Sequence, residues 1–140
     1  MNRQSPILAV DDDEDDLMLL KEAYDSFNLP NELILLRSGD ELVEYLQSAK
    51  ERPLLVICDY NLPKMNGLEI RRKMLEDPNT HYRSIPFVLL STAMSKTQIR
   101  NGFDQEVQGF FVKPGSFSQL KLILSSIINY WQFSERPEAE

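Results

Sequence analysis

The chain has 140 residues, with 15 basic and 22 acidic side chains and a formal net charge of -7. This length is typical of one domain with a proper core, and the acidic balance disfavours non-specific nucleic-acid binding. No apolar run approaches the roughly 20 residues of a membrane span, and the single cysteine excludes an internal disulfide. We therefore expect one cytoplasmic domain over residues 5–133, a short polar tail over residues 134–140, and no binding to DNA or to a membrane.

Five short apolar runs recur along the chain, and helical patterns fill most of the gaps between them. The runs cover residues 7–10, 33–36, 54–58, 87–90 and 110–112. The helices are predicted between the first two runs as far as residue 28, from residue 39, over about residues 67–76, around residues 95–103, and from residue 117 to about residue 131. Strand and helix alternating five times is typical of a parallel sheet with helices on both faces. The predicted fold class is therefore α/β, with a doubly wound five-stranded parallel sheet and five helices.

The third apolar run ends in Asp59, and Asn61, Pro63, Asn66 and Gly67 follow within a few residues. An unbroken apolar run predicts a strand that is buried on both faces, and ligands bind beyond the carboxyl ends of such strands. A carboxylate next to a buried strand is costly unless it is paired, bound to a metal or used chemically. Asp59 is therefore the first candidate for a functional residue.

Polar side chains also follow the other predicted strands. The first run leads into residues 11–16, which are all acidic, the fourth into Ser91 and Thr92, and the fifth into Lys113. In a parallel sheet these positions meet at one edge. Clustered carboxylates suit Mg²⁺, whereas a lysine and a hydroxyl suit a phosphoryl group. Together with a carboxylate nucleophile, they indicate phosphoryl transfer to an aspartate.

These motifs, in this order, resemble the receiver domain of two-component response regulators over about residues 6–131. The matching pieces are Asp11-Asp12-Asp13 after the first run, Asp59 at the end of the third, the loop from Asn61 to Gly67, Pro86 leading into Ser91-Thr92, and Lys113-Pro114 after the fifth. Each piece is weak alone, but their ordered combination is specific. The resemblance implies a flavodoxin-like fold with strand order 2-1-3-4-5.

The resemblance implies a phosphoacceptor and a metal site. Asp59 would accept a phosphoryl group from a histidine kinase or a histidine phosphotransfer protein. Mg²⁺ would be bound by Asp11, Asp12 and Asp59, with Asp12 the favoured direct ligand, and by the backbone carbonyl of Asn61.

It also implies the residues that respond to the phosphoryl group. Lys113 would contact the phosphoryl oxygens, and its peptide bond to Pro114 would be cis. Ser91, or the adjacent Thr92, would supply a switch hydroxyl, and Phe110 would supply a switch ring without a hydroxyl of its own.

By the same resemblance, the protein is a signalling module and not an enzyme, with at most self-phosphorylation and slow self-dephosphorylation. Because no effector sequence follows Trp131, we expect a stand-alone regulator whose output is contact with a protein target, contact with a second copy of itself, or onward transfer of the phosphoryl group. Leu122, Tyr130 and Phe133 lie off the core stripe of the last helix and are candidate dimer contacts.

The acidic run has other interpretations. Asp12 or Asp13 could cap the first helix, with the rest solvated near its positive end. An EF-hand loop is rejected because Asp16 stands where that loop needs a glycine. Residues 11–13 also fit the Asp-x-Asp start of haloacid-dehalogenase-type phosphatases, with Asp11 as nucleophile, but Asp15 departs from that pattern and Asp59 stays unexplained. Beside a phosphorylated switch and a phosphatase, a third class of protein compatible with the sequence is an interaction module that is never phosphorylated.

Overall fold

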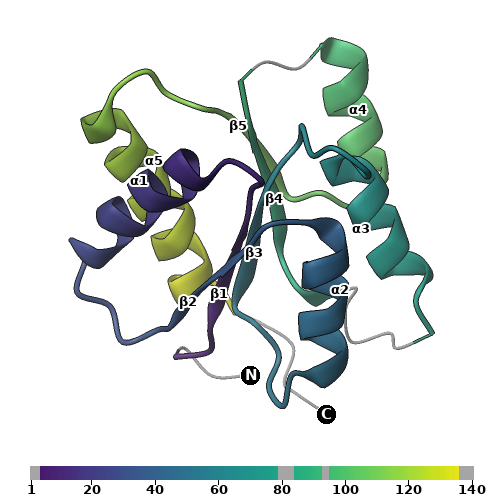
Figure 1. The fold of residues 1–140 in the computed structure, drawn as a ribbon, viewed down its shortest axis with the longest axis horizontal. Coiled ribbons are helices and arrows are strands. Elements are labelled where there is room, and N and C mark those ends of the chain that lie inside the picture. The colour runs from purple at the N-terminus through teal and green to yellow at the C-terminus, as the bar shows by residue number, and fades with distance from the viewer. Residues whose placement is uncertain (1–3, 79–83, 93–94, 136–140) are drawn as a thin grey trace.

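The computed structural model describes residues 4–78, 84–92 and 95–135, and its centre is a five-stranded sheet between two layers of helices (Figure 1). All the strand pairs are parallel, and the order is β2-β1-β3-β4-β5. The strands are β1 (Ile7–Val10), β2 (Leu33–Leu36), β3 (Leu55–Asp59), β4 (Phe87–Ser91) and β5 (Gly109–Val112). The predicted fold class, strand order and number of strands are confirmed.

The three central strands, β1, β3 and β4, are buried along their whole length, whereas the edge strands β2 and β5 are partly exposed. Burial on both faces is why the central strands appear in the sequence as unbroken apolar runs. Both β3 and β4 extend one residue past their apolar runs, because Asp59 pairs with Leu90 and Ser91 pairs with Val112. The sheet ladder therefore carries these two polar residues to its very edge.

Two helices cover one face of the sheet and three cover the other (Figure 1). The first layer contains α1 (Glu14–Asp25) and α5 (Phe117–Phe133), and the second contains α2 (Gly39–Ser48), α3 (Gly67–Glu76) and α4 (Lys96–Asp104). Side chains cap the five helices at Asp13, Ser38, Asn66, Ser95 and Ser116. Among the residues that the structure describes, no helix combines the length and hydropathy that crossing a membrane requires.

Each face of the sheet packs into its own core, because successive strand residues point to opposite sides. In β4, for example, Phe87 and Leu89 belong to the core under α2 and α3, and Val88 and Leu90 belong to the core under α1 and α5.

The core under α2 and α3 also contains a charged side chain, Arg71 of α3, which is fully buried. Its guanidinium donates to the backbone carbonyl of Glu106 at 3.0 Å and lies 5.4 Å above the ring of Phe87. These contacts compensate for the loss of water around the guanidinium.

Tyr24 of α1 supplies a pH-dependent contribution to stability. Its buried hydroxyl donates to the carbonyl of Asn31 at 2.7 Å, and burial, helped by the charge of Asp25, raises the pKa of Tyr24 to about 12. Because the folded chain resists ionisation of this phenol, the stabilisation is complete below the ordinary pKa near 10 and is lost as the pH rises toward 12. We expect the free energy of unfolding to fall by about 2 kcal/mol more in the wild type than in Tyr24→Phe between about pH 9 and pH 12. Urea titrations of both chains would measure this difference, and parallel pH profiles would contradict it.

Candidate functional site

The polar residues at the carboxyl ends of the strands gather in one crevice, as the sequence predicts. Asp11 follows β1, Asp59 ends β3 and Lys113 follows β5. The ammonium of Lys113 lies 3.0 Å from Asp11 Oδ2 and 3.4 Å from Asp59 Oδ2. Both carboxylates are almost fully buried, so two acidic groups and one basic group share a site with limited access to water.

Backbone hydrogen bonds orient the two buried carboxylates. The N–H of Asp13 donates to Asp11 Oδ1 at 3.0 Å, and the N–H of Asn61 donates to Asp59 Oδ1 at 3.2 Å. The N–H of Lys113 donates to the carbonyl of Ser91 at 2.6 Å and continues the β4–β5 ladder to the edge of the crevice. In Asp11 and Asp59 the second oxygen, Oδ2, is therefore the one that faces the ammonium.

Three carboxylates form a group that fits a divalent cation. Asp11, Asp12 and Asp59 each offer one oxygen, and these oxygens lie within 4.8 Å of one another. Carboxylate oxygens are the donors that hard cations prefer, and Asp12 is exposed while the other two are buried. The backbone N–H of Asn61 donates to Asp59, which places Asn61 beside this group. The contact of the Asn61 carbonyl with a metal stays a prediction.

The charged groups of the crevice shift one another's pKa values. Burial raises the pKa of Asp11, although the bonds from the Asp13 N–H and from Lys113 oppose the shift. Burial works against protonation of Lys113, but its hydrogen bonds to Asp16 and Asp11 outweigh this, so the pKa of Lys113 lies above its usual range.

Cys58 lies behind the site, where burial and the neighbouring carboxylates raise the pKa of its thiol well above the ordinary value. This cysteine is a protonated core residue and not a nucleophile.

Of the two adjacent candidates for the switch hydroxyl, Ser91 is in the crevice and Thr92 is not. Ser91 is buried, and its Oγ accepts a hydrogen bond of 3.1 Å from the side-chain amide of Asn61. Thr92 is exposed. This difference depends on the strand register, because Ser91 still pairs with β5 and Thr92 lies beyond the ladder.

Phe110, the predicted switch ring, is half-buried and packs against α4. Its ring centre lies 5.1 Å from that of Phe103, and a Cβ added to Gly102 would come within 1.9 Å of its Cζ atom. The ring can therefore occupy this position against α4 only because residue 102 has no side chain.

One expectation from the resemblance is wrong. The Lys113–Pro114 peptide bond is trans, as are the other peptide bonds of the described residues. Trans is the lower-energy form for X–Pro bonds in general, by about 0.5–1 kcal/mol. In this conformation Lys113 reaches both Asp11 and Asp59.

The start of α1 decides between the alternative interpretations of the acidic run. Asp13 caps α1, and its side chain accepts from the N–H groups of Asp15 and Asp16. Because α1 begins at Glu14, a helix occupies the middle of the segment that an EF-hand loop would need, and that rejection is confirmed.

The helices that follow β3 and β4 are capped by residues outside the crevice. Asn66 caps α3 and Ser95 caps α4. Asp59, Ser91 and Thr92 are therefore not helix caps, and capping does not explain their presence at the edge of the sheet.

Sequence reasoning missed one member of the site. The acidic run predicts a solvated Asp16, but its Oδ2 accepts a hydrogen bond of 2.8 Å from Lys113. A signal was present, because Asp16 lies four residues before the buried Leu20 and therefore on the same side of α1.

Comparisons with known proteins agree with this geometry. The response regulator receiver domain family matches residues 7–125. The chain therefore belongs to the response regulator receiver family. Members of this family are in general signalling modules of two-component systems and not enzymes.

Individual relatives resemble this receiver over nearly their whole length. The probable methanogenesis regulatory protein FilR2 of Methanothrix harundinacea is 30% identical over 129 residues, which are 89% of this chain and 82% of the relative. Response regulator Rcp1 of Synechocystis sp. is 28% identical over 135 residues, which are 93% of this chain and 90% of the relative.

Solved structures extend the similarity to the fold. The phosphorylated cyanobacterial phytochrome response regulator RcpA has a TM-score of 0.85 at 30% identity, covering 96% of this chain and 99% of that one. The Mn²⁺-bound form of Rcp1 has a TM-score of 0.82 at 26% identity, with the same coverage. The flavodoxin-like fold predicted for the receiver is confirmed.

Proposed function

We propose that this receiver accepts a phosphoryl group on Asp59 and that the modification, which requires Mg²⁺, switches a protein-interaction surface. The donor is a phosphohistidine of a histidine kinase or of a histidine phosphotransfer protein. A carboxylate oxygen of Asp59 forms a bond to phosphorus while the P–N bond of the phosphohistidine breaks, and the released imidazole takes a proton from solvent.

The observation that carries the proposal is the position of Lys113 Nζ, 3.4 Å from Asp59 Oδ2, beside a group of three carboxylates. The ammonium would pair with the phosphoryl oxygens, which bring about -1.5 to -2 charges into an acidic crevice. Asp11, Asp12, Asp59 and the carbonyl of Asn61 would hold Mg²⁺, which neutralises further negative charge when it is bound.

Two relatives support these assignments, because RcpA has been crystallised phosphorylated and Rcp1 with Mn²⁺. Family membership also weighs against the phosphatase with Asp11 as its nucleophile. Any catalysis by this chain would then be limited to self-phosphorylation and slow self-dephosphorylation of Asp59.

The switch that we propose uses Ser91 and Phe110. The Ser91 hydroxyl, now bonded to Asn61, would turn toward the new phosphoryl oxygens, and the Phe110 ring would move into the space that it leaves. The exposure of Thr92 favours Ser91 for this role.

The output is contact with a downstream protein or with a second copy of the chain. Candidate dimer contacts are Leu122, Tyr130 and Phe133 of α5, which are 65%, 65% and 82% exposed. Large apolar side chains on one exposed helix are typical of such contacts.

The test is the intact mass of the protein after incubation with acetyl phosphate or phosphoramidate and Mg²⁺, next to Asp59→Asn. We expect a labile gain of about 80 Da, the mass of one phosphoryl group, in the wild type only. An adduct of the same size on Asp59→Asn, or none on the wild type with Mg²⁺ bound, would contradict the proposal. Phosphate release that continues in Asp59→Asn but stops in Asp11→Asn would point to the phosphatase.

A further inference from the structure

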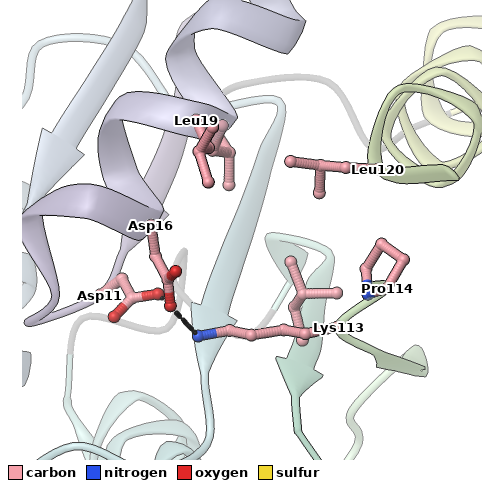
Figure 2. Close-up of a pocket in the computed structure, with 8 residues that line it drawn as sticks. Asp11, Asp16, Leu19, Lys113, Pro114 and Leu120 are labelled. Atoms are coloured by element: carbon pink, nitrogen blue, oxygen red, sulfur yellow. Dashed lines mark hydrogen bonds and ion pairs between the residues drawn. The ribbon is translucent and has the colours of Figure 1, made fainter. Parts of the chain in front are cut away.

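Lys113 makes its shortest contact with a carboxylate outside the candidate metal group. Its ammonium lies 2.8 Å from Asp16 Oδ2 (Figure 2). The corresponding distances are 3.0 Å to Asp11 and 3.4 Å to Asp59. Asp16 is on α1, whereas Asp11 and Asp59 are at the strand ends. The contact with Asp16 therefore draws the ammonium toward α1 and away from the phosphoacceptor.

The first turn of α1 fixes the position of Asp16. The capping side chain of Asp13 accepts the N–H of Asp16 at 3.2 Å and that of Asp15 at 2.9 Å, so both residues belong to the same rigid turn. The side chain of Asp16 is 40% exposed and points into the crevice toward Lys113 (Figure 2), whereas Asp15 is exposed. The two neighbours therefore carry the same charge at the same helix end, but only Asp16 is bonded to Lys113 in the structure.

Apolar residues partly shield this ion pair from water. Asp16 and Lys113 form the polar end of a pocket of about 90 Å³ whose other walls include Leu19, Pro114 and Leu120 (Figure 2). The side chain of Lys113 is only 19% exposed. Solvent screens such a pair less than it screens a pair with two exposed partners, so the pair has more influence on where the ammonium lies.

The position of this ammonium affects the metal site directly. Lys113 and a cation would compete for the same two carboxylates, because Asp11 and Asp59 belong to the carboxylate group and both lie within 3.4 Å of Lys113 Nζ. Without a partner on α1, the ammonium would move closer to Asp59 Oδ2, which it already faces at 3.4 Å, and would repel a cation there.

We propose that Asp16 is a positioning residue that holds Lys113 on the α1 side of the crevice and thereby keeps Asp59 available to Mg²⁺. The inference rests on the proposed function, because it concerns the same metal site. Asp16 acts through Lys113 and is not itself assigned to the metal.

The experiment is calorimetric titration of Mg²⁺ into the metal-free protein at one ionic strength. The variants are Asp16→Asn and, as a matched control for charge and helix position, Asp15→Asn. We expect Asp16→Asn to bind Mg²⁺ roughly three- to tenfold more weakly than Asp15→Asn, because the released ammonium moves toward the metal position. Both substitutions are repeated in a Lys113→Met background, which keeps an unbranched side chain that is one atom shorter and removes its charge. There we expect the two dissociation constants to agree within about twofold, since no ammonium remains to be positioned.

The possible results separate the inference from the proposed function. Equal affinities of Asp16→Asn and Asp15→Asn would overturn the role of Asp16 while leaving the metal site intact. A difference that persists in the Lys113→Met background would also overturn it, because the effect would then not pass through the ammonium. A wild-type chain that binds no Mg²⁺ would overturn the metal site and the inference together. Thermal unfolding of each variant shows that the folded protein was titrated.

Discussion

Asp12→Asn is expected to weaken Mg²⁺ binding by at least about tenfold without loss of fold stability. Asp12 contributes one of the three oxygens of the carboxylate group, and it is the exposed member. Lys113 forms ion pairs with Asp11, Asp16 and Asp59, so within the carboxylate group Asp12 is the member that the ammonium does not contact. Calorimetric titration of Mg²⁺ would measure the change in affinity.

Unfolding in urea separates this effect from a structural one. In the presence of a chelator, Asp12→Asn should unfold within about 0.5 kcal/mol of the wild type, because the residue is exposed. With Mg²⁺ at 100 times the wild-type dissociation constant, the wild type should gain about 2.7 kcal/mol and the variant much less. Equal metal stabilisation of both chains would remove Asp12 from the set of ligands.

Phe87→Ala is expected to lower the free energy of unfolding by about 3–5 kcal/mol. Phe87 is fully buried in the central strand β4, and Arg71 lies above its ring at 5.4 Å. Truncation would leave a cavity in the core and would remove the aromatic face from a guanidinium that has no access to water. Urea unfolding followed by circular dichroism would measure the loss.

Phe133→Ala is the matched control for this prediction. The residue has the same side chain, but it is 82% exposed at the end of α5, so we expect a change within about 0.5 kcal/mol. A similar loss for both substitutions would mean that burial in the core under α3 does not account for the effect of Phe87.

The site depends on contacts between residues that are far apart in the chain. Lys113 is separated from Asp11 by 102 positions and from Asp16 by 97. Parallel pairing of β1, β3, β4 and β5 is what brings these residues to one edge. Because ion pairs act over a few ångströms, the charges of the crevice influence one another only after the sheet has formed.

Much of this fold is predictable from local patterns. The strand Ile7–Val10, the strand Leu33–Leu36 and the helix Gly67–Glu76 have the bounds that the sequence indicates. Other boundaries shift by a few residues, and two of the shifts occur where a polar residue continues a strand, as Asp59 does in β3 and Ser91 does in β4. Hydrophobic periodicity predicts which positions are buried, but it does not predict that a polar residue forms the last backbone pair of a strand.

The α/β architecture and the group of residues at the strand ends can be read from the chain alone, because burial on both faces and helical spacing leave direct traces in the order of apolar residues. Two features needed the folded protein: Ser91 and not Thr92 enters the crevice, and Asp16 is bonded to Lys113. Both depend on the strand register and on side-chain directions across elements, which are set by packing between distant segments. Asp15 and Asp16 carry the same charge at the start of one helix, and in the folded protein the largely buried side chain of Lys113 is bonded to Asp16.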